Sequence, residues 1–317
     1  MSSVRFRVLP RAALSFAEHS LRRTTEKWLT IALLTLPGMI IFLMFLLIPI
    51  FQSSYYSLFK WNGFGPPTDF RGLSNYIDLF KDSVFIRSIL NSLILMSSSL
   101  LLQLPLALGL ALLVGRGRLF GRQLFRAILF IPYIFSEVIT ALIWLYVLHP
   151  NMGLMNRVFE AIIPNFKYIA WLADRNIALY AIFLVLTWKY FGFYMILYMA
   201  GLQSIPKELE EAGRIDGCNE FQVLRFVTIP LLGRTIRLTI FLSVLGSFQQ
   251  FVVVWILTQG GPVNATSTIA TYLYKYGIQR FALGYGSAVA VVLFCITLFF
   301  SLGYQRIVMY QDYVLRD

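Results

Sequence analysis

The chain has 317 residues, and charged residues make up only 13% of them, against roughly 25% in an average soluble domain. Apolar residues make up 58%, the mean hydropathy is +0.71 and the formal net charge is +12. A compact soluble domain of this size could not bury so much apolar surface, so this composition disfavours a soluble enzyme, a nucleic-acid-binding protein and a disordered regulator, and indicates several membrane spans.

The N-terminal segment, residues 1–29, is basic and is followed by an uncharged stretch over residues 28–59. The apolar core of a secretory signal peptide is only about 7–15 residues long. We therefore expect a short cytosolic segment followed by a retained first membrane helix.

A membrane helix needs about 20 mostly apolar residues. Six stretches meet this requirement, near 30–51, 89–114, 127–148, 177–199, 235–258 and 284–306. The alternating pattern of an outer-membrane barrel is absent. The sequence thus predicts an all-α integral membrane protein with six transmembrane helices, which form one domain over residues 30–317.

Basic residues divide unevenly between the two sides of such an arrangement. Seventeen lie in the N-terminal segment, the second and fourth loops and the C-terminal tail, and nine lie in the other three loops. Because lysine and arginine accumulate on the cytosolic side, we expect both termini in the cytosol.

The fourth loop, residues 203–234, holds five of the 15 acidic residues, namely Glu208, Glu210, Glu211, Asp216 and Glu220. Pro206 suits a first helical turn, Gly217 suits a left-handed helix end, and Asn219 with Gln222 resembles a capping box. Pro230 is expected to break the second helix. The loop is therefore predicted to be a pair of short helices, either a docking element for a cytosolic partner or a solvated connector.

A spaced motif lies in this loop. It reads Glu211-Ala212-Gly213, three residues, Gly217, nine residues, and Val227-Thr228-Ile229-Pro230. It resembles the EAA motif of binding-protein-dependent ABC importer permeases, which is E-A-A, three residues, G, nine residues, I-x-L-P. The departures are Gly213 for Ala, Val227 for Ile and Ile229 for Leu.

Further segments along the chain resemble the MalF-type sugar permeases, which belong to the carbohydrate group of importers. These segments are Leu36-Pro37-Gly38, Pro49, Phe130-Ile131-Pro132, Ile143-Trp144, Pro150 to Asn156, Ala200 to Pro206, and Thr258 to Pro262 with Thr266 and Thr268. The resemblance implies a type I importer permease, a pore subunit in a bacterial or archaeal cytoplasmic membrane, with no catalytic or metal-binding residues of its own.

The resemblance also implies partners. These are a second homologous permease, two ABC ATPase subunits that carry ATP and Mg, an extracytoplasmic solute-binding protein and a carbohydrate substrate. Glu211 is expected to contact the ATPase and Gly217 to allow the turn. The remaining motif residues, Ala212, Gly213, Asp216, Val227, Ile229 and Pro230, are expected to share in this coupling.

Two charges fall near the bilayer midplane, Glu137 in the third span and Lys189 in the fourth. An ionisable group there costs at least ~2.5 kcal/mol on insertion scales. Our hypothesis is that both face the translocation cavity, paired with each other or bonded to substrate. The alternatives are a structural ion pair, or a lysine that extends towards Trp188 and Tyr190.

A sugar pathway also needs amides, hydroxyls and aromatic faces. Ser247 and Gln250 share a helical face, and Phe193 shares the face of Lys189, so these are candidate lining residues. A midplane lysine is compatible with an anionic sugar or a glycerol phosphate. The rival interpretation of the chain is an autonomous secondary transporter or channel that uses Glu137 and Lys189, with Glu137 as a proton site.

Overall fold

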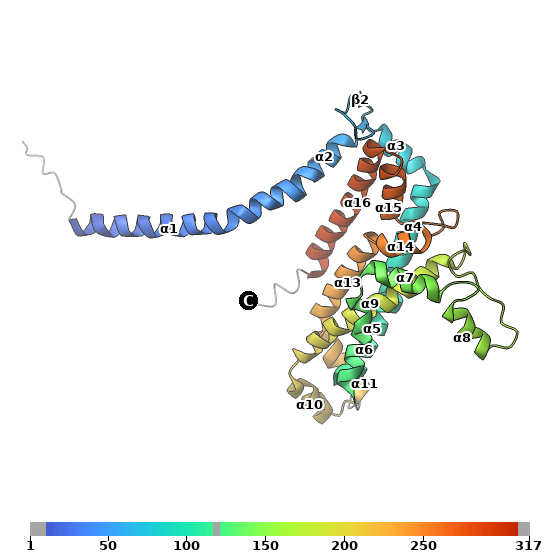
Figure 1. Ribbon diagram of the computed structural model, residues 1–317. Helices are drawn as coiled ribbons and strands as arrows, with labels where there is room; N and C mark the ends of the chain where they lie inside the picture. Colours follow the sequence, from blue (N-terminus) through green and yellow to red (C-terminus); the bar gives the residue numbers. More distant parts are fainter. Residues whose placement is uncertain (1–10, 117–120, 310–317) are drawn as a thin grey trace, which may run out of the picture. The chain divides into compact units, whose positions relative to one another are not determined.

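The computed structural model describes residues 11–116 and 121–309, and most of them are helical (Figure 1). The chain divides into two compact units, residues 1–55 and 56–317. The first unit is one helical run of α1 (Arg11–Phe42), a π-helical turn, η1 (Leu43–Leu47), and α2 (Ile48–Tyr56). Its apolar part, Glu26–Tyr56, contains the predicted first span.

The second unit begins with a two-stranded antiparallel hairpin, β1 (Phe59–Lys60) and β2 (Asp69–Phe70), in which Phe59 pairs with Phe70. The first helices after it are α3 (Ser74–Lys81), α4 (Ser83–Ser98), η2 (Ser99–Gln103), α5 (Leu104–Arg116), α6 (Arg122–Ile134), α7 (Glu137–Val147), α8 (Leu154–Ile162) and α9 (Ala178–Gln203). They are followed by α10 (Lys207–Ile215), α11 (Glu220–Val223), η3 (Leu224–Thr228), α12 (Ile229–Leu231), α13 (Gly233–Phe248), α14 (Val252–Thr258), α15 (Ile269–Tyr272), η4 (Leu273–Ile278), α16 (Leu283–Tyr304) and η5 (Gln305–Met309).

Four helical runs in the described part of the chain are long and apolar enough to cross a membrane. They are Glu26–Tyr56, Ser83–Gly115, Ala178–Gln203 and Leu283–Met309. Two bent helix pairs raise this number to six if each pair counts as one span. The first, second, fourth and sixth predicted spans lie largely within the four continuous runs.

The third predicted span, 127–148, is not one helix. It breaks at Phe135 and Ser136, where α6 and α7 meet at 99°. Ser136 has an extended backbone, and its side-chain oxygen accepts a hydrogen bond from the Ile139 amide at 3.2 Å. A serine cap thus starts a new helix inside an apolar stretch, and hydropathy alone does not reveal such a start.

The fifth predicted span, 235–258, is interrupted as well. Helix α13 ends at Phe248, and α14 begins at Val252. The carbonyl of Gln250, which lies in the gap, accepts a hydrogen bond from Thr268 Oγ1 at 2.8 Å. A side chain 18 residues away therefore satisfies a backbone group that the break leaves without a helical partner.

Helix α9 is the centre of the packing. Buried side chains lie on every face of it, which is typical of a helix enclosed by others. It contributes to two apolar clusters, one formed with α7 and α14 and the other with α5 and α13. A third cluster joins α4 and α13 to α15 and α16. The helices that flank the interior therefore pack on a common central helix.

Gly192 permits the closest of these approaches, because a Cβ atom at that position would overlap the backbone carbonyl of Leu129 in α6. Small residues allow such contacts between membrane helices. We expect Gly192→Ala to destabilise the protein by about 1–3 kcal/mol, the usual effect of overpacking. The thermal midpoint of the detergent-solubilised protein should fall accordingly. Gly109→Ala in α5, where a Cβ would meet nothing within 4 Å, is the matched control and should not lower the midpoint.

A candidate coupling segment and a candidate translocation cavity

The segment 203–234, which we call the coupling segment, forms the predicted pair of short helices. They lie at one end of the second unit, opposite the end that carries β2 and α3 (Figure 1). Gly217 has a φ of +89° and terminates α10, and the Cys218 amide bonds back to the Gly213 carbonyl at 3.0 Å. Asn219 and Gln222 form both bonds of a capping box at the start of α11. Both predictions of a helix boundary are confirmed.

The two prolines of the segment behave differently from expectation. Pro206 precedes α10 as its N-cap residue. Pro230 does not break the second helix, because helical structure continues over Glu220–Leu231 and the 66° bend follows at Leu232. A π-helical turn, η3, directly precedes the proline, and this widened backbone accommodates the ring.

An ion pair joins the two short helices, α10 and α11. Arg214 Nε and Nη2 donate to the two carboxylate oxygens of Glu220 at 2.7 and 3.1 Å. This hydrogen-bonded pair raises the pKa of Arg214 and lowers the pKa of Glu220. Because the Glu220 pKa is lower in the folded protein, the pair contributes above the ordinary carboxyl pKa and is lost as the pH falls through the lowered one.

A second contact is buried. Glu210 is 7% exposed, and one of its carboxylate oxygens accepts a hydrogen bond from Thr228 Oγ1 at 2.5 Å. The bond joins α10 to the end of η3. The sequence groups Glu210 with four other acidic residues of the loop, and only the fold distinguishes it from the others.

The motif residues divide into packing and exposed groups. Gly213 and Val227 face each other, since a Cβ on Gly213 would lie 3.5 Å from Val227 Cγ2. The other motif residues are exposed, namely Glu211, Ala212, Asp216, Gly217, Ile229 and Pro230. Two apolar side chains outside the motif are also exposed, Ile215 at 85% and Phe221 at 67%. The segment therefore presents an acidic and apolar surface on a braced pair of helices.

Gly213 departs from the alanine of the motif, yet the structure has room for alanine. At 3.5 Å the added methyl group would make an ordinary van der Waals contact with Val227. Because alanine is favoured over glycine inside a helix by about 1 kcal/mol, Gly213→Ala should stabilise α10 by up to that amount. Hydrogen exchange of the α10 amides in the solubilised protein should slow, and transport should not fall. Faster exchange in the variant would contradict the packing described here.

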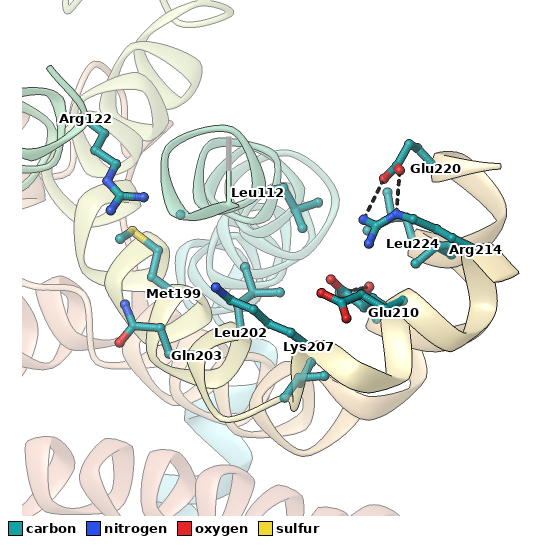
Figure 2. A pocket seen from close by; sticks show the side chains of 15 residues that line it. Leu112, Arg122, Met199, Leu202, Gln203, Lys207, Glu210, Arg214, Glu220 and Leu224 are labelled. Atoms are coloured by element: carbon teal, nitrogen blue, oxygen red, sulfur yellow. Dashed lines mark hydrogen bonds and ion pairs between the residues drawn. The ribbon is translucent and has the colours of Figure 1, made fainter. Parts of the chain in front are cut away.

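A cavity of about 710 Å³ lies between the coupling segment and the ends of α5 and α9. Figure 2 shows Arg122 on one side of it and the Arg214–Glu220 pair on the other. Its lining includes three basic and three acidic residues, namely Arg122, Lys207, Arg214, Glu210, Glu211 and Glu220. The coupling segment therefore stands partly away from the bundle and is joined to it mainly through its two ends.

A second cavity, of about 350 Å³, is lined by residues of α6, α7, α9 and α13 and is called here the inner cavity. Four of the five candidate pathway residues line it, namely Glu137, Phe193, Ser247 and Gln250. Ser247 is on α13, whereas Gln250 lies beyond the end of that helix, so a shared helical face is not what brings the two together. The sequence did not identify the other polar lining residues, namely Ser99, Gln103, Tyr133, Tyr190, Tyr194, Ser243 and Gln249.

Lys189, the fifth candidate, is not among the lining residues. It is 3% exposed, and its ammonium group donates to the Phe135 carbonyl at 2.6 Å. Glu137 instead accepts a hydrogen bond from the Tyr190 hydroxyl. Within residues 26–115 and 121–309, no ion pair joins Lys189 to Glu137. The two intramembrane charges are therefore satisfied separately.

The break between α6 and α7 explains both charges. Phe135 follows the C-terminal end of α6, where backbone carbonyls give a partial negative charge, and Lys189 bonds there. Glu137 is the first residue of α7, where backbone amides give a partial positive charge. The helix ends thus provide a structural reason for each charge.

The profile of the family described as "Binding-protein-dependent transport system inner membrane component" matches residues 103–308. The diacetylchitobiose uptake system permease protein NgcF of Streptomyces coelicolor is 32% identical over 271 residues, which cover 82% of this chain and 77% of that protein. A crystal structure of a bacterial ABC transporter involved in the import of the acidic polysaccharide alginate contains a chain with a TM-score of 0.76 and 27% identity, over 91% of this chain and 99% of that one. A second alginate transporter structure, in complex with an alginate pentasaccharide-bound periplasmic protein, gives a TM-score of 0.76 and 26% identity, over 90% and 95% of the two chains.

These matches confirm the resemblance drawn from the EAA-type motif, and they favour an importer subunit over an autonomous secondary transporter. The matched region contains the coupling segment and all the residues that line the inner cavity except Leu95 and Ser99. The chain belongs to the family of binding-protein-dependent inner membrane components and is a permease subunit of a carbohydrate ABC importer.

Proposed function

We propose that this chain forms half of a sugar pore and that its coupling segment docks on an ATPase subunit and converts closure of the ATPases into alternating access. The main support for this proposal is the structure of the coupling segment. Two short helices are braced by the Arg214–Glu220 pair and the Glu210–Thr228 bond, while Ile215 and Phe221 stand exposed between them. A braced pair with exposed apolar side chains can dock and transmit a displacement as one body.

The connections of the segment lead to the inner cavity. Helix α9 runs into α10 through a three-residue link, and helical structure continues from α11 to α12 before the bend into α13. Tyr190, Phe193 and Tyr194 of α9 and Ser243 and Ser247 of α13 line the inner cavity. A movement of the docked segment would therefore reach the cavity walls directly through two helices.

The proposed complex contains a second, homologous permease, two ABC ATPase subunits that bind ATP and Mg, and an extracytoplasmic binding protein. The family description and the periplasmic protein in the similar alginate structure support the binding protein. The basic residues support a chain in the cytoplasmic membrane with both termini in the cytosol. The coupling segment would then face the ATPases, as docking requires.

The proposal is tested by purifying the tagged chain with its companions in mild detergent and measuring ATP hydrolysis. Recovery of a second permease and an ATPase, with hydrolysis raised by a sugar-loaded binding protein, is the expected result. A chain that purifies alone and supports no ATP hydrolysis would refute the proposal.

A further inference from the structure

The lining of the inner cavity suits a sugar without charge. Apart from the Glu137 carboxylate, its polar groups are hydroxyls and amides, which exchange hydrogen bonds with sugar hydroxyls, and its aromatic rings offer apolar faces. The ring of Tyr133 stacks on Phe193 with centroids 4.7 Å apart and planes 18° apart. Gln249 and Gln250 line the same cavity, and the described part of the chain supplies no hydrogen-bond partner for either side-chain amide. These two amides are therefore available to a ligand.

Glu137 is the only charged residue among the lining residues in the described part of the chain. Its Oε1 accepts a hydrogen bond from Tyr190, and Oε2 has no bonded partner within the same described part. Oε2 can thus accept a hydrogen bond from a sugar hydroxyl. It would repel the carboxylate of an acidic sugar.

Lys189, the cation that lies against the aromatic lining in the described part of the chain, already has a hydrogen-bond acceptor. Lys189 lies behind the aromatic lining, with Nζ 5.9 Å from the ring centroid of Tyr133 and 5.4 Å from that of Tyr190. Its ammonium group bonds to the Phe135 carbonyl. Because Lys189 is buried and is not among the lining residues, an anionic ligand in the cavity could contact it only if its ammonium group moved past the aromatic rings. The anionic sugar that a midplane lysine suggested from the sequence is therefore not favoured by this geometry.

We propose that the inner cavity takes an uncharged carbohydrate and discriminates against acidic ones, with Glu137 as the residue that sets this discrimination. The inference rests on the proposed role of the cavity in the sugar pathway. A carboxylate in the wall excludes anionic sugars by leaving two like charges close together in a partly dehydrated site, which is a form of specificity by repulsion.

The test compares sugars that differ only in charge. The complete transporter is placed in lipid nanodiscs without its binding protein, so that only the membrane site is probed. Saturation-transfer NMR then measures binding of maltose and cellobiose, and of the same two disaccharides with one primary alcohol oxidised to a carboxylate. We expect at least one neutral disaccharide to bind about tenfold or more tightly than its uronate form, which corresponds to about 1.4 kcal/mol.

Two variants connect the discrimination to the wall charge. Glu137→Gln keeps an amide oxygen that can accept the Tyr190 hydrogen bond. It should reduce the affinity difference between the neutral disaccharide and its uronate form to below about threefold. Gln250→Glu adds a second carboxylate to the lining and should increase the affinity difference between the neutral disaccharide and its uronate form. If Glu137→Gln fails to fold, Gln250→Glu still tests the inference. The two variants should change the affinity difference in opposite directions.

Equal or tighter binding of the uronate form would overturn the inference, as would the absence of binding by both neutral disaccharides. An unchanged ratio in the folded variants would also overturn it. ATP hydrolysis stimulated by the sugar-loaded binding protein, measured on the same preparation, tests the proposed function separately. If that stimulation is present and the charge discrimination is absent, only the inference fails.

Discussion

Replacing Ile215 and Phe221 together by aspartate is expected to abolish ATP-driven sugar uptake while the permease stays folded. Both side chains are exposed, so the change removes no contact from the core. Burial of each in an ATPase cleft would contribute about 1.5–3 kcal/mol, so losing both should weaken docking by at least about a hundredfold. The measurement is retention of the ATPase subunit on the tagged permease, together with uptake into proteoliposomes.

Val263→Asp is the control for this change. Val263 is 80% exposed and lies in the loop between α14 and α15, outside the coupling segment. The same apolar-to-acidic change there should leave ATPase retention at the wild-type level. If the double variant also retains the ATPase and transports at the wild-type rate, the exposed tip of the segment is not the docking surface.

The second large effect is expected at Lys189. Lys189→Met keeps the length of the side chain but removes the donor to the Phe135 carbonyl at the end of α6. A hydrogen bond from a charged donor contributes about 1.5–3 kcal/mol, so the thermal midpoint should fall and the break between α6 and α7 should loosen. Because Glu137 at the start of α7 lines the inner cavity, uptake should fall as well. Thermal unfolding and proteoliposome uptake measure the two effects.

Thr187→Val tests whether any polar-to-apolar change in α9 has the same result. The Thr187 hydroxyl is buried, and the described part of the chain offers it no hydrogen-bond partner. Its removal should be neutral or stabilising. Wild-type stability and uptake in Lys189→Met would show that the ammonium group is not needed at the helix end.

The helices of the coupling segment could be predicted because their signals are local. A left-handed glycine and a capping box each act within a few residues, and Gly217 and Asn219 with Gln222 are found as expected. Pro230 was misinterpreted because the π-helical turn before it is not encoded by any residue type that marks a helix end.

The breaks in the third and fifth spans could not be read from hydropathy, because the sequence is mostly apolar on both sides of each break. Ser136 was a possible cap in retrospect, but serine is also common inside membrane helices, where it bonds to its own backbone. The partner of the Gln250 carbonyl is Thr268, which no sequence pattern links to it.

The contacts of the two intramembrane charges could not be predicted from the sequence either. Their depth could be predicted from the spans, and it suggested a pair or a common site. The third span, however, breaks beside Glu137, so each charge meets a helix end, Lys189 at Phe135 and Glu137 at the start of α7. Long-range contacts created by that break decide which of the two residues reaches the cavity.

We expect sugar to move through this chain only when an ATPase closes on its coupling segment. The most direct test is sugar uptake into proteoliposomes that hold the purified complex, with the loaded binding protein outside and ATP inside. We expect uptake to require ATP, the ATPase subunits and the binding protein. We also expect uptake to be unchanged when proton and sodium gradients are dissipated. Uptake by this chain alone, driven by an ion gradient without ATP, would contradict it.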